Sequence, residues 1–241
     1  MCMMAFANVA SAELVNGINF LSAEYDASGE FEATILTGLT EDGENYPIWG
    51  MVQDSYYFSS QSNPIDYNYS YSHSNVDSFG YDYGDTSVYI GHNSGHLSVD
   101  TYASLSTPWM EWGVVNSYTT GIWHFQPQYS DMELRFDIDC MQGWGESIGS
   151  ISLCDNTAGF TLISESLNSN NYDYIVWTLN NNPSYSVDPT HTYSLVLETR
   201  GSSQRGEGYL GGGISAEISA IPEPATLLLL GLGCLALRKR R

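Results

Sequence analysis

The sequence predicts an all-β protein, an antiparallel two-sheet sandwich of the jelly-roll kind. The composition is rich in Tyr (18) and Gly (23), and only 15% of the 241 residues are charged, which favours pleated strands over solvent-exposed helices. Short β-like runs recur about every ten residues and are separated by clusters of Gly, Asn, Asp, Ser and Pro. No window shows a long apolar period of 3.6 residues, so the sequence predicts no helix in the body.

The predicted strands are apolar or alternating runs, bounded by turn residues. In chain order they are 18–25, 31–38, 87–91, 97–103, 110–115, 121–125, 132–138, 147–153, 172–179, 191–199 and 211–219. The last two runs flank a turn at 201–206, and this pattern predicts a closing hairpin. The sheet is therefore expected to end just before residue 220.

Three segments follow from the composition along the chain. Residues 1–12 are small and apolar and end in Ala-Ser-Ala, which fits cleavage by signal peptidase before Glu13. This stretch has no basic n-region, so we interpret it as the remnant of a longer signal peptide, the alternative being an unstructured N-terminus. Residues 13–219 form the β-sandwich body, and residues 220–241 form a tail.

The body is strongly acidic. Between residues 13 and 221 only Arg135, Arg200 and Arg205 oppose 27 acidic residues, a formal charge of −24, and the segment contains no lysine. Such a surface repels phosphate backbones, which excludes nucleic-acid binding. It suits solubility in a salty medium, and it would also attract divalent cations.

The tail has three parts in a fixed order. An extended motif, Pro222-Glu223-Pro224, is followed by an apolar run at 225–237 and then by a basic cluster of Arg238, Lys239, Arg240 and Arg241. The apolar run spans about 20 Å as a helix, which is short against a hydrocarbon core of about 30 Å. The basic cluster would stay on the cytoplasmic side, so the tail suits a helix that pauses in the membrane.

This tail resembles the PEP-CTERM sorting signal, which is recognised by the membrane protease exosortase. The resemblance is confined to residues 221–241 and contains all three elements at the end of the chain. It implies export by way of signal peptidase, transit through the inner membrane, and cleavage near the Pro-Glu-Pro motif. The body would then reach the cell surface or extracellular polymer of a Gram-negative-type bacterium, where polysaccharide is a candidate partner.

Two cysteines lie in the body. Cys140 and Cys154 each end a strand-like run, and an oxidising compartment would permit a disulfide if the two runs pair as a hairpin. Two free thiols are the alternative, because spacing alone does not fix the geometry.

Aromatic side chains suggest a second function, that of a carbohydrate-binding module. A strand through residues 67–71 would place three rings on one face, where they could stack on sugars; with two nearby indoles, the candidates are Tyr67, Tyr69, Tyr71, Trp109 and Trp112. The alternative is that the same rings are buried in the core.

Catalytic and metal signals are weak. Glu111 and Glu133 are the pair we would nominate for a glycan hydrolase, because such an enzyme needs two carboxylates across a cleft. No Gly-x-Ser-x-Gly elbow or nucleotide-binding loop is present, and His92 and His96 flank a turn rather than a helix. The acidic loop 41–45 and the pairs Asp137/Asp139 and Asp82/Asp85 would permit calcium without indicating it. We therefore expect a non-enzymatic, exported surface or matrix protein without a cofactor.

Overall fold

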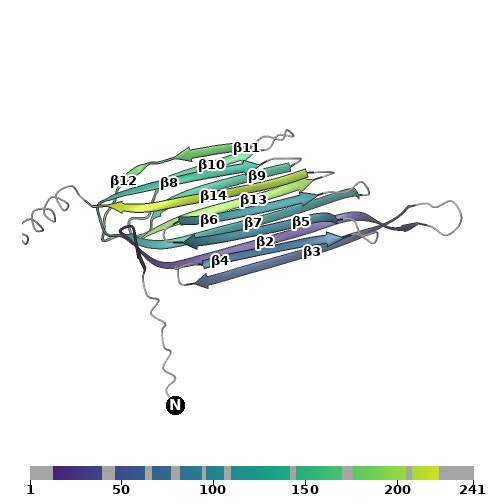
Figure 1. The fold of residues 1–241 in the computed structure, drawn as a ribbon, viewed down its shortest axis with the longest axis horizontal. Coiled ribbons are helices and arrows are strands. Elements are labelled where there is room, and N and C mark those ends of the chain that lie inside the picture. The colour runs from purple at the N-terminus through teal and green to yellow at the C-terminus, as the bar shows by residue number, and fades with distance from the viewer. Residues whose placement is uncertain are drawn as a thin grey trace, which may run out of the picture.

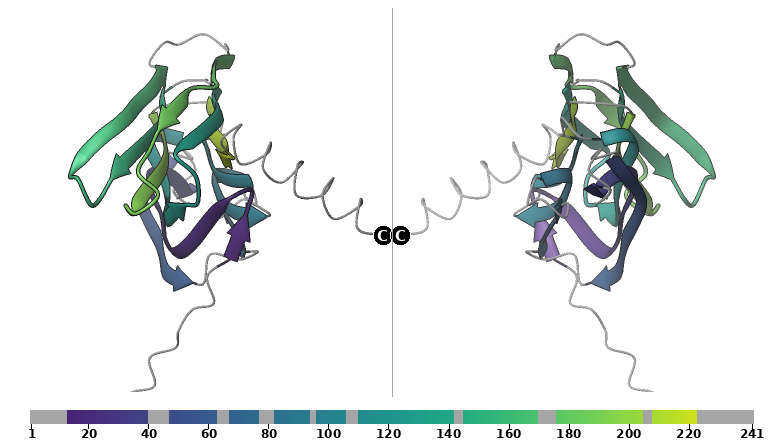
Figure 2. Two further views of the ribbon diagram at one scale, coloured as in Figure 1. Left: turned by 90° about the vertical axis from the view of Figure 1, so that its left-hand side faces the viewer. Right: turned by 90° about the vertical axis from the view of Figure 1, so that its right-hand side faces the viewer.

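The computed structural model contains two antiparallel β-sheets packed face to face, as Figures 1 and 2 show. The structure describes residues 13–39, 47–62, 67–76, 82–93, 96–105, 110–141, 145–169, 176–204 and 208–222. Within these ranges the regular structure is strand throughout, so the predicted two-sheet sandwich is confirmed. The short C-terminal helix predicted for the tail lies outside the described residues.

In the part of the chain that the structure describes, each sheet has seven strands. Sheet A contains β1 (Glu13–Val15), β2 (Ile18–Leu39), β3 (Pro47–Ser62), β7 (Met110–Pro127), β9 (Gly145–Asp155), β10 (Phe160–Ser169) and β13 (Tyr193–Gln204). Sheet B contains β4 (Tyr67–Val76), β5 (Asp82–Asn93), β6 (His96–Leu105), β8 (Asp131–Met141), β11 (Val176–Asn181), β12 (Ser184–Ser186) and β14 (Gly208–Ile221).

The first described strand, β1, lies at the edge of a sheet, whereas the last described strand, β14, lies inside one. In sheet A the order is β1-β2-β7-β13-β9-β10, with β3 also paired to β2; in sheet B it is β11-β8-β14-β6-β5-β4, with β12 also paired to β8. From β6 onward the chain changes sheet at almost every connection. The N-terminal β1 therefore lies at an edge of sheet A, whereas β14, the last strand, lies inside sheet B between β6 and β8.

One predicted hairpin is wrong for this reason, and a second pairing, which the sequence left open, does not form. The closing pair does not form, because β13 belongs to sheet A and β14 to sheet B. The hairpin that would have joined Cys140 to Cys154 does not form either, because β8 and β9 lie in different sheets. Both thiols are free; Cys140 is buried, and its Sγ lies 3.7 Å from the carbonyl oxygen of Leu167. Burial raises the pKa of the Cys140 thiol, which keeps it protonated.

Alternation along the strands builds the core. Trp123 and Phe125 of β7 point inward with Tyr25 of β2, while Ile122 and His124 point outward. The ring centroids of Tyr25 and Trp123 are 5.7 Å apart in an edge-to-face arrangement. Burying each large side chain contributes roughly 1.5–3 kcal/mol relative to leaving it exposed, so this row contributes much of the force that holds the sheets together.

A turn fixes the register at the N-terminal edge. Asn16 and Gly17 join β1 to β2 with φ values of 51° and 75°, and a two-residue turn of this kind needs both residues in the left-handed region. The turn also contacts the last strand, because the amide of Ala220 donates to the carbonyl of Asn16 over 2.9 Å. The start of the described chain and the end of β14 therefore meet at one end of the sandwich.

Candidate functional site

The chain leaves the sandwich directly before its sorting motif. β14 pairs with β8 as far as Ile221, which lies opposite Asp131. Pro222 has no amide hydrogen and cannot extend the ladder, so the sheet stops there. β14 thus runs two residues beyond the predicted strand 211–219 and ends at the residue before the motif.

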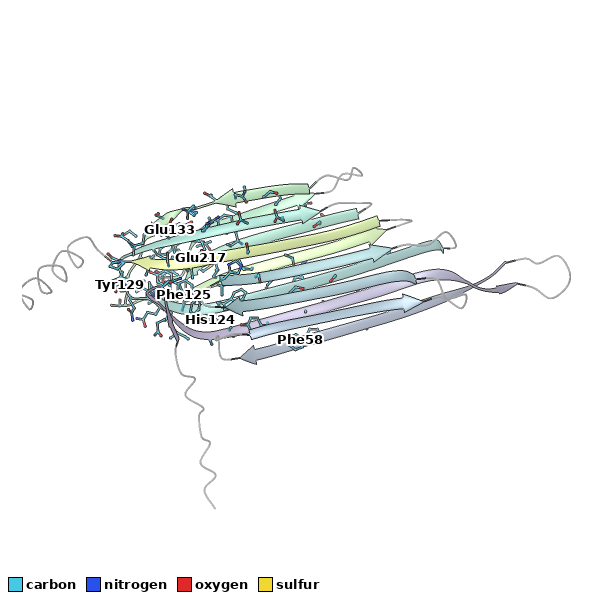
Figure 3. All side chains as sticks on the ribbon, in the orientation of Figure 1. Phe58, His124, Phe125, Tyr129, Glu133 and Glu217 are labelled. Atoms are coloured by element: carbon cyan, nitrogen blue, oxygen red, sulfur yellow. The ribbon has the colours of Figure 1, made fainter. Side chains whose placement is uncertain are left out.

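Two shallow hollows flank this exit point. One is lined by Gly17, Tyr129 and Pro222, and the other by Met132, Tyr185 and Pro222. Figure 3 places Tyr129 at the end of the sandwich where β14 stops. Pro222 is partly exposed and the side chain of Ile221 is 41% exposed, so the chain enters the motif at the surface rather than from the core.

A second cluster joins two loops at an end of sheet A, and the sequence did not single it out. Asp155 is the last residue of β9 and is only 3% exposed. One carboxylate oxygen accepts hydrogen bonds from the amides of Thr157 (3.0 Å) and Ala158 (2.8 Å). The other lies 2.7 Å from Nδ1 of His191. We call this group, with Asp188 and Tyr193, the Asp155 clasp.

Asp188 completes the Asp155 clasp from the loop before β13. Its carboxylate accepts from the amide and hydroxyl of Thr190 over 2.8 and 2.7 Å, and lies 3.6 Å from Nε2 of His191. The amide of Asp188 donates to the hydroxyl of Tyr193 over 3.0 Å. Both nitrogens of the imidazole therefore face carboxylates, an arrangement that stabilises the imidazolium rather than activating a nucleophile.

The pKa values in the Asp155 clasp move accordingly. The hydrogen bond to Asp155, helped by the two carboxylate charges, raises the pKa of His191 despite partial burial. Burial pushes the pKa of Asp155 upward, but the hydrogen bonds from Ala158 and His191 and the imidazolium charge together lower it. The pair is therefore most stable as an ion pair.

The predicted sugar-stacking residues fall in different sheets. Tyr67, Tyr69 and Tyr71 lie on the edge strand β4, where they are paired with residues of β5, whereas Trp112 lies on β7 in sheet A. Trp109 lies outside the described residues. The stacking role of the three tyrosines stays a prediction.

The two carboxylates nominated for hydrolysis do not face each other. Glu111 is at the start of β7, whereas Glu133 follows the turn at the other end of that strand. The length of β7 between them is ~50 Å at the rise of an antiparallel strand, and a glycosidase pair needs no more than ~9.5 Å. Glu133 instead accepts a hydrogen bond from Asn182 over 2.7 Å.

No cation site emerges from the part of the chain that the structure describes. Among those residues no group of three or more His, Cys, Asp or Glu could hold a metal ion. Asp137 and Asp139 lie on the outer face of β8, and Asp82 and Asp85 lie on β5. The acidic loop 41–45 is outside the described residues. His92 lies on β5 and His96 begins β6; the two strands are antiparallel, with His92 opposite Leu97 and Asn93 opposite His96, and residues 94–95 between them lie outside the described residues.

Comparison with known proteins identifies the tail. Residues 220–241 match the family model of the PEP-CTERM protein-sorting motif, so the resemblance predicted from the sequence is confirmed. The chain thus carries the signal of a protein that is exported and processed by an exosortase-type membrane protease. Within the described residues there is no helix with the length and apolar character needed to span a bilayer. The Pro-Glu-Pro motif beyond Pro222, the apolar run and the basic cluster lie outside those residues.

The body gives no comparable match. A search of curated proteins finds no similar sequence. Among solved structures, that of the infectious bursal disease virus Gx strain is 11% identical with a TM-score of 0.28, covering 90% of this chain and 59% of the viral chain. A family 11 carbohydrate-binding module from Clostridium thermocellum, bound to a mixed-linked tetrasaccharide, is 13% identical with a TM-score of 0.22, covering 81% and 98%. TM-scores this low carry no argument about this chain.

A third solved structure, that of the bacteriophage CBA120 tailspike protein 4, is 12% identical with a TM-score of 0.27 and covers 64% of this chain. The present chain spans about three fifths of the viral chain and 19% of the tailspike chain. The function of the body therefore has to be argued from its own residues.

Proposed function

We propose that the sandwich is a non-enzymatic domain of the cell surface or extracellular matrix of a Gram-negative-type bacterium, released from its tail by exosortase. The observation that carries this proposal is the position of the motif, which follows β14 without a spacer. A cut after Pro224 removes no residue of either sheet. The released product would be the whole sandwich with a three-residue extension.

Several features support a role without catalysis or a cofactor. Of the two nominated residues, Glu111 lies near the start of β7 and Glu133 lies on β8, beyond the other end of β7. The imidazole of His191 is held between two carboxylates and has no hydroxyl or thiol nucleophile within hydrogen-bonding distance among its described contacts. The strongly acidic body keeps such a protein soluble at high salt outside the cell.

The test is the intact mass of the protein recovered outside a host that contains exosortase and outside a matched host that lacks it. We expect the first product to lack the residues after about Pro224, and the second host to retain the tail. Glu223→Ala should block or slow this processing. Glu217→Ala is the matched control, because Glu217 is an exposed glutamate on β14 that lies outside the motif. A full-length tail on exported protein from the competent host would overturn the proposal.

A further inference from the structure

The outer face of sheet A carries an open hollow of about 470 Å³ that neither the sorting motif nor the Asp155 clasp uses. Four strands build it, since Ser28 of β2 lies opposite Tyr118 of β7, Tyr118 lies opposite Arg200 of β13, and Arg200 lies opposite Ile148 of β9. Its polar lining consists of Ser28, Glu30, Asn116, Tyr118, Glu146 and Arg200, with Ser202.

Tyr118 and Arg200 both line the hollow and contact each other. The guanidinium carbon of Arg200 lies 5.5 Å from the centroid of the Tyr118 ring, and one guanidinium nitrogen lies 3.4 Å from the carboxylate of Glu198. Both side chains keep exposed surface. Burial and the Glu198 charge raise the pKa of Tyr118, so the hydroxyl keeps its proton and can donate a hydrogen bond.

A second tyrosine lies in the same cross-strand row. Tyr57 of β3 is opposite Ser28 and is 74% exposed, unusually high for an aromatic side chain, and its hydroxyl lies 3.3 Å from a carboxylate oxygen of Asp26. Two strand spacings, about 9.5 Å, separate the backbones at Tyr57 and Tyr118. The small side chain of Ser28 lies between them, which leaves an open span flanked by two rings.

The charges around the row select the chemistry of the ligand. Among the described residues, Asp26, Glu30, Glu146 and Glu198 lie along the hollow and the row with one cation, Arg200, so the formal charge of this set is −3. Such a surface repels a polyanion, whereas carboxylates and a guanidinium together accept and donate hydrogen bonds to hydroxyl groups. A tyrosine ring adds a flat apolar face for stacking and a polar tip.

We propose that this row, Tyr57, Ser28, Tyr118 and Arg200, binds a neutral polysaccharide chain laid across the strands of sheet A. The two rings stack on sugar faces, and Arg200 with the flanking carboxylates binds the hydroxyl groups. The site differs from the predicted stacking residues on β4 and β7, since it combines side chains from four neighbouring strands of one sheet, β3, β2, β7 and β13. It goes beyond the sorting function, because it gives the body a polymer partner.

The test measures binding of the full-length chain, held in mild detergent, so the result does not depend on whether exosortase processes the tail. The probes are neutral oligosaccharides of β-1,4-glucan, β-1,3-glucan, β-1,4-galactan, xylan and mannan, with polygalacturonate as the acidic comparison, all titrated by calorimetry. We expect at least one neutral probe to bind. Tyr57→Ala and Arg200→Gln should each raise its dissociation constant about tenfold, the effect of losing one stacking or charged contact.

Two variants control for the loss of an aromatic ring or a charge elsewhere. Phe160→Ala removes a ring that is 52% exposed at the start of β10, and Arg135→Gln removes an exposed arginine beside Asp137 and Glu217 on the outer face of sheet B. Both should bind like the wild type. The proposal is overturned if no neutral probe binds, if only polygalacturonate binds, or if the two row variants bind like the controls. None of these outcomes changes the mass of the exported product, so the sorting proposal is judged separately.

Discussion

Trp123 covers the inner face of β7 next to Gly121, and the two residues fit only because one of them has no side chain. A Cβ placed on Gly121 would lie 2.7 Å from Cζ3 of the Trp123 ring. The indole is fully buried and packs edge to face against Tyr25, so it has no room to move aside. This position is therefore a test of how tightly the core is packed.

Gly121→Ala should lower the free energy of unfolding by about 1–3 kcal/mol, the usual cost of overpacking a core. Urea denaturation measures it. The control is the same substitution in a Trp123→Phe background, because phenylalanine lacks the outer indole atoms Cη2, Cζ3 and Cζ2 that the new methyl would meet. The penalty should largely disappear there, and an equal penalty in both backgrounds would show that the clash is not its cause.

His191 should make stability depend on pH in a definite direction. The pKa of His191 is raised in the folded protein. Its contribution to the free energy of unfolding is therefore fully present below the unfolded-state pKa of about 6.5, and it is lost as pH rises through the pKa of the folded state. The pKa of Asp155 is lowered in the folded protein. Its contribution to stability is therefore lost only in acidic solution, as pH falls below the unfolded-state pKa of about 3.9. The Asp155–His191 pair is therefore strongest between these limits.

Thermal unfolding followed from pH 6 to pH 9 tests this. The midpoint of the wild type should fall more steeply than that of His191→Gln, which cannot lose a proton in this range. Asp188→Asn leaves the 2.7 Å contact between His191 and Asp155 in place and should keep most of the wild-type slope. Parallel curves for the wild type and His191→Gln would rule out the Asp155 clasp as a pH-sensitive contact.

At the level of the elements, the sequence predicts the strands better than their pairing. The runs 18–25 and 31–38 were predicted as two strands but form the single strand β2, because the turn-like stretch between them is paired on both sides and Gly29 points into the core. The same holds for β7. Strands β1, β3, β10 and β12 have no counterpart among the predicted runs. Strand β10 is a largely exposed edge strand without clear alternation, so its sequence gives no strong strand signal.

The functional sites also differ in how well the sequence predicts them. The sorting motif is continuous in sequence, so three short patterns in a row are enough to find it. The Asp155 clasp joins residues 36 positions apart, and the row on sheet A joins Tyr57, Tyr118 and Arg200 from three strands. Their only local signals are the Asp-Asn-Thr and Asp-Pro-Thr turns of the clasp, which predict Asp side chains bonded to the backbone and not the partner histidine.

The placement of β8 and β9 in different sheets gives an element-level prediction. Alkylation of the unfolded protein without reductant should modify Cys140 and Cys154 completely, because the two strands do not bring the sulfurs together. Peptide mapping by mass spectrometry reads both sites. A peptide pair joined by a disulfide between these cysteines would contradict the sheet assignment.

On the scale of the whole molecule, the formal charge of −24 on the body should make folding sensitive to salt. Repulsion among exposed carboxylates opposes the compact state, and its range falls from ~10 Å at 0.1 M to ~3 Å at 1 M ionic strength. We expect the melting temperature to rise by at least about 2–4 °C when NaCl is raised between these concentrations, equivalent to about 1 kcal/mol for a domain of this size.

Differential scanning calorimetry provides the measurement. The double variant Glu133→Gln/Glu217→Gln removes two negative charges from the outer face of sheet B, where Figure 3 labels both residues. It should reduce the rise in melting temperature that NaCl produces. An uncharged osmolyte at matched osmolarity controls for general exclusion effects. A melting temperature that is constant or falls with added NaCl would show that the acidic surface does not oppose folding.

Because β14 lies inside sheet B and directly precedes the sorting motif, a chain that carries the motif also carries every strand needed to complete the sheet. Because β14 pairs with both β6 and β8, sheet B cannot close until the last strand has been synthesised, and the sorting motif follows within one residue of that strand. A ribosome that stops early therefore yields a product lacking both a central strand of sheet B and the sorting motif. Under the proposed function, exosortase would not recognise such truncated copies, so sorting would be restricted to chains that contain every strand of the sandwich.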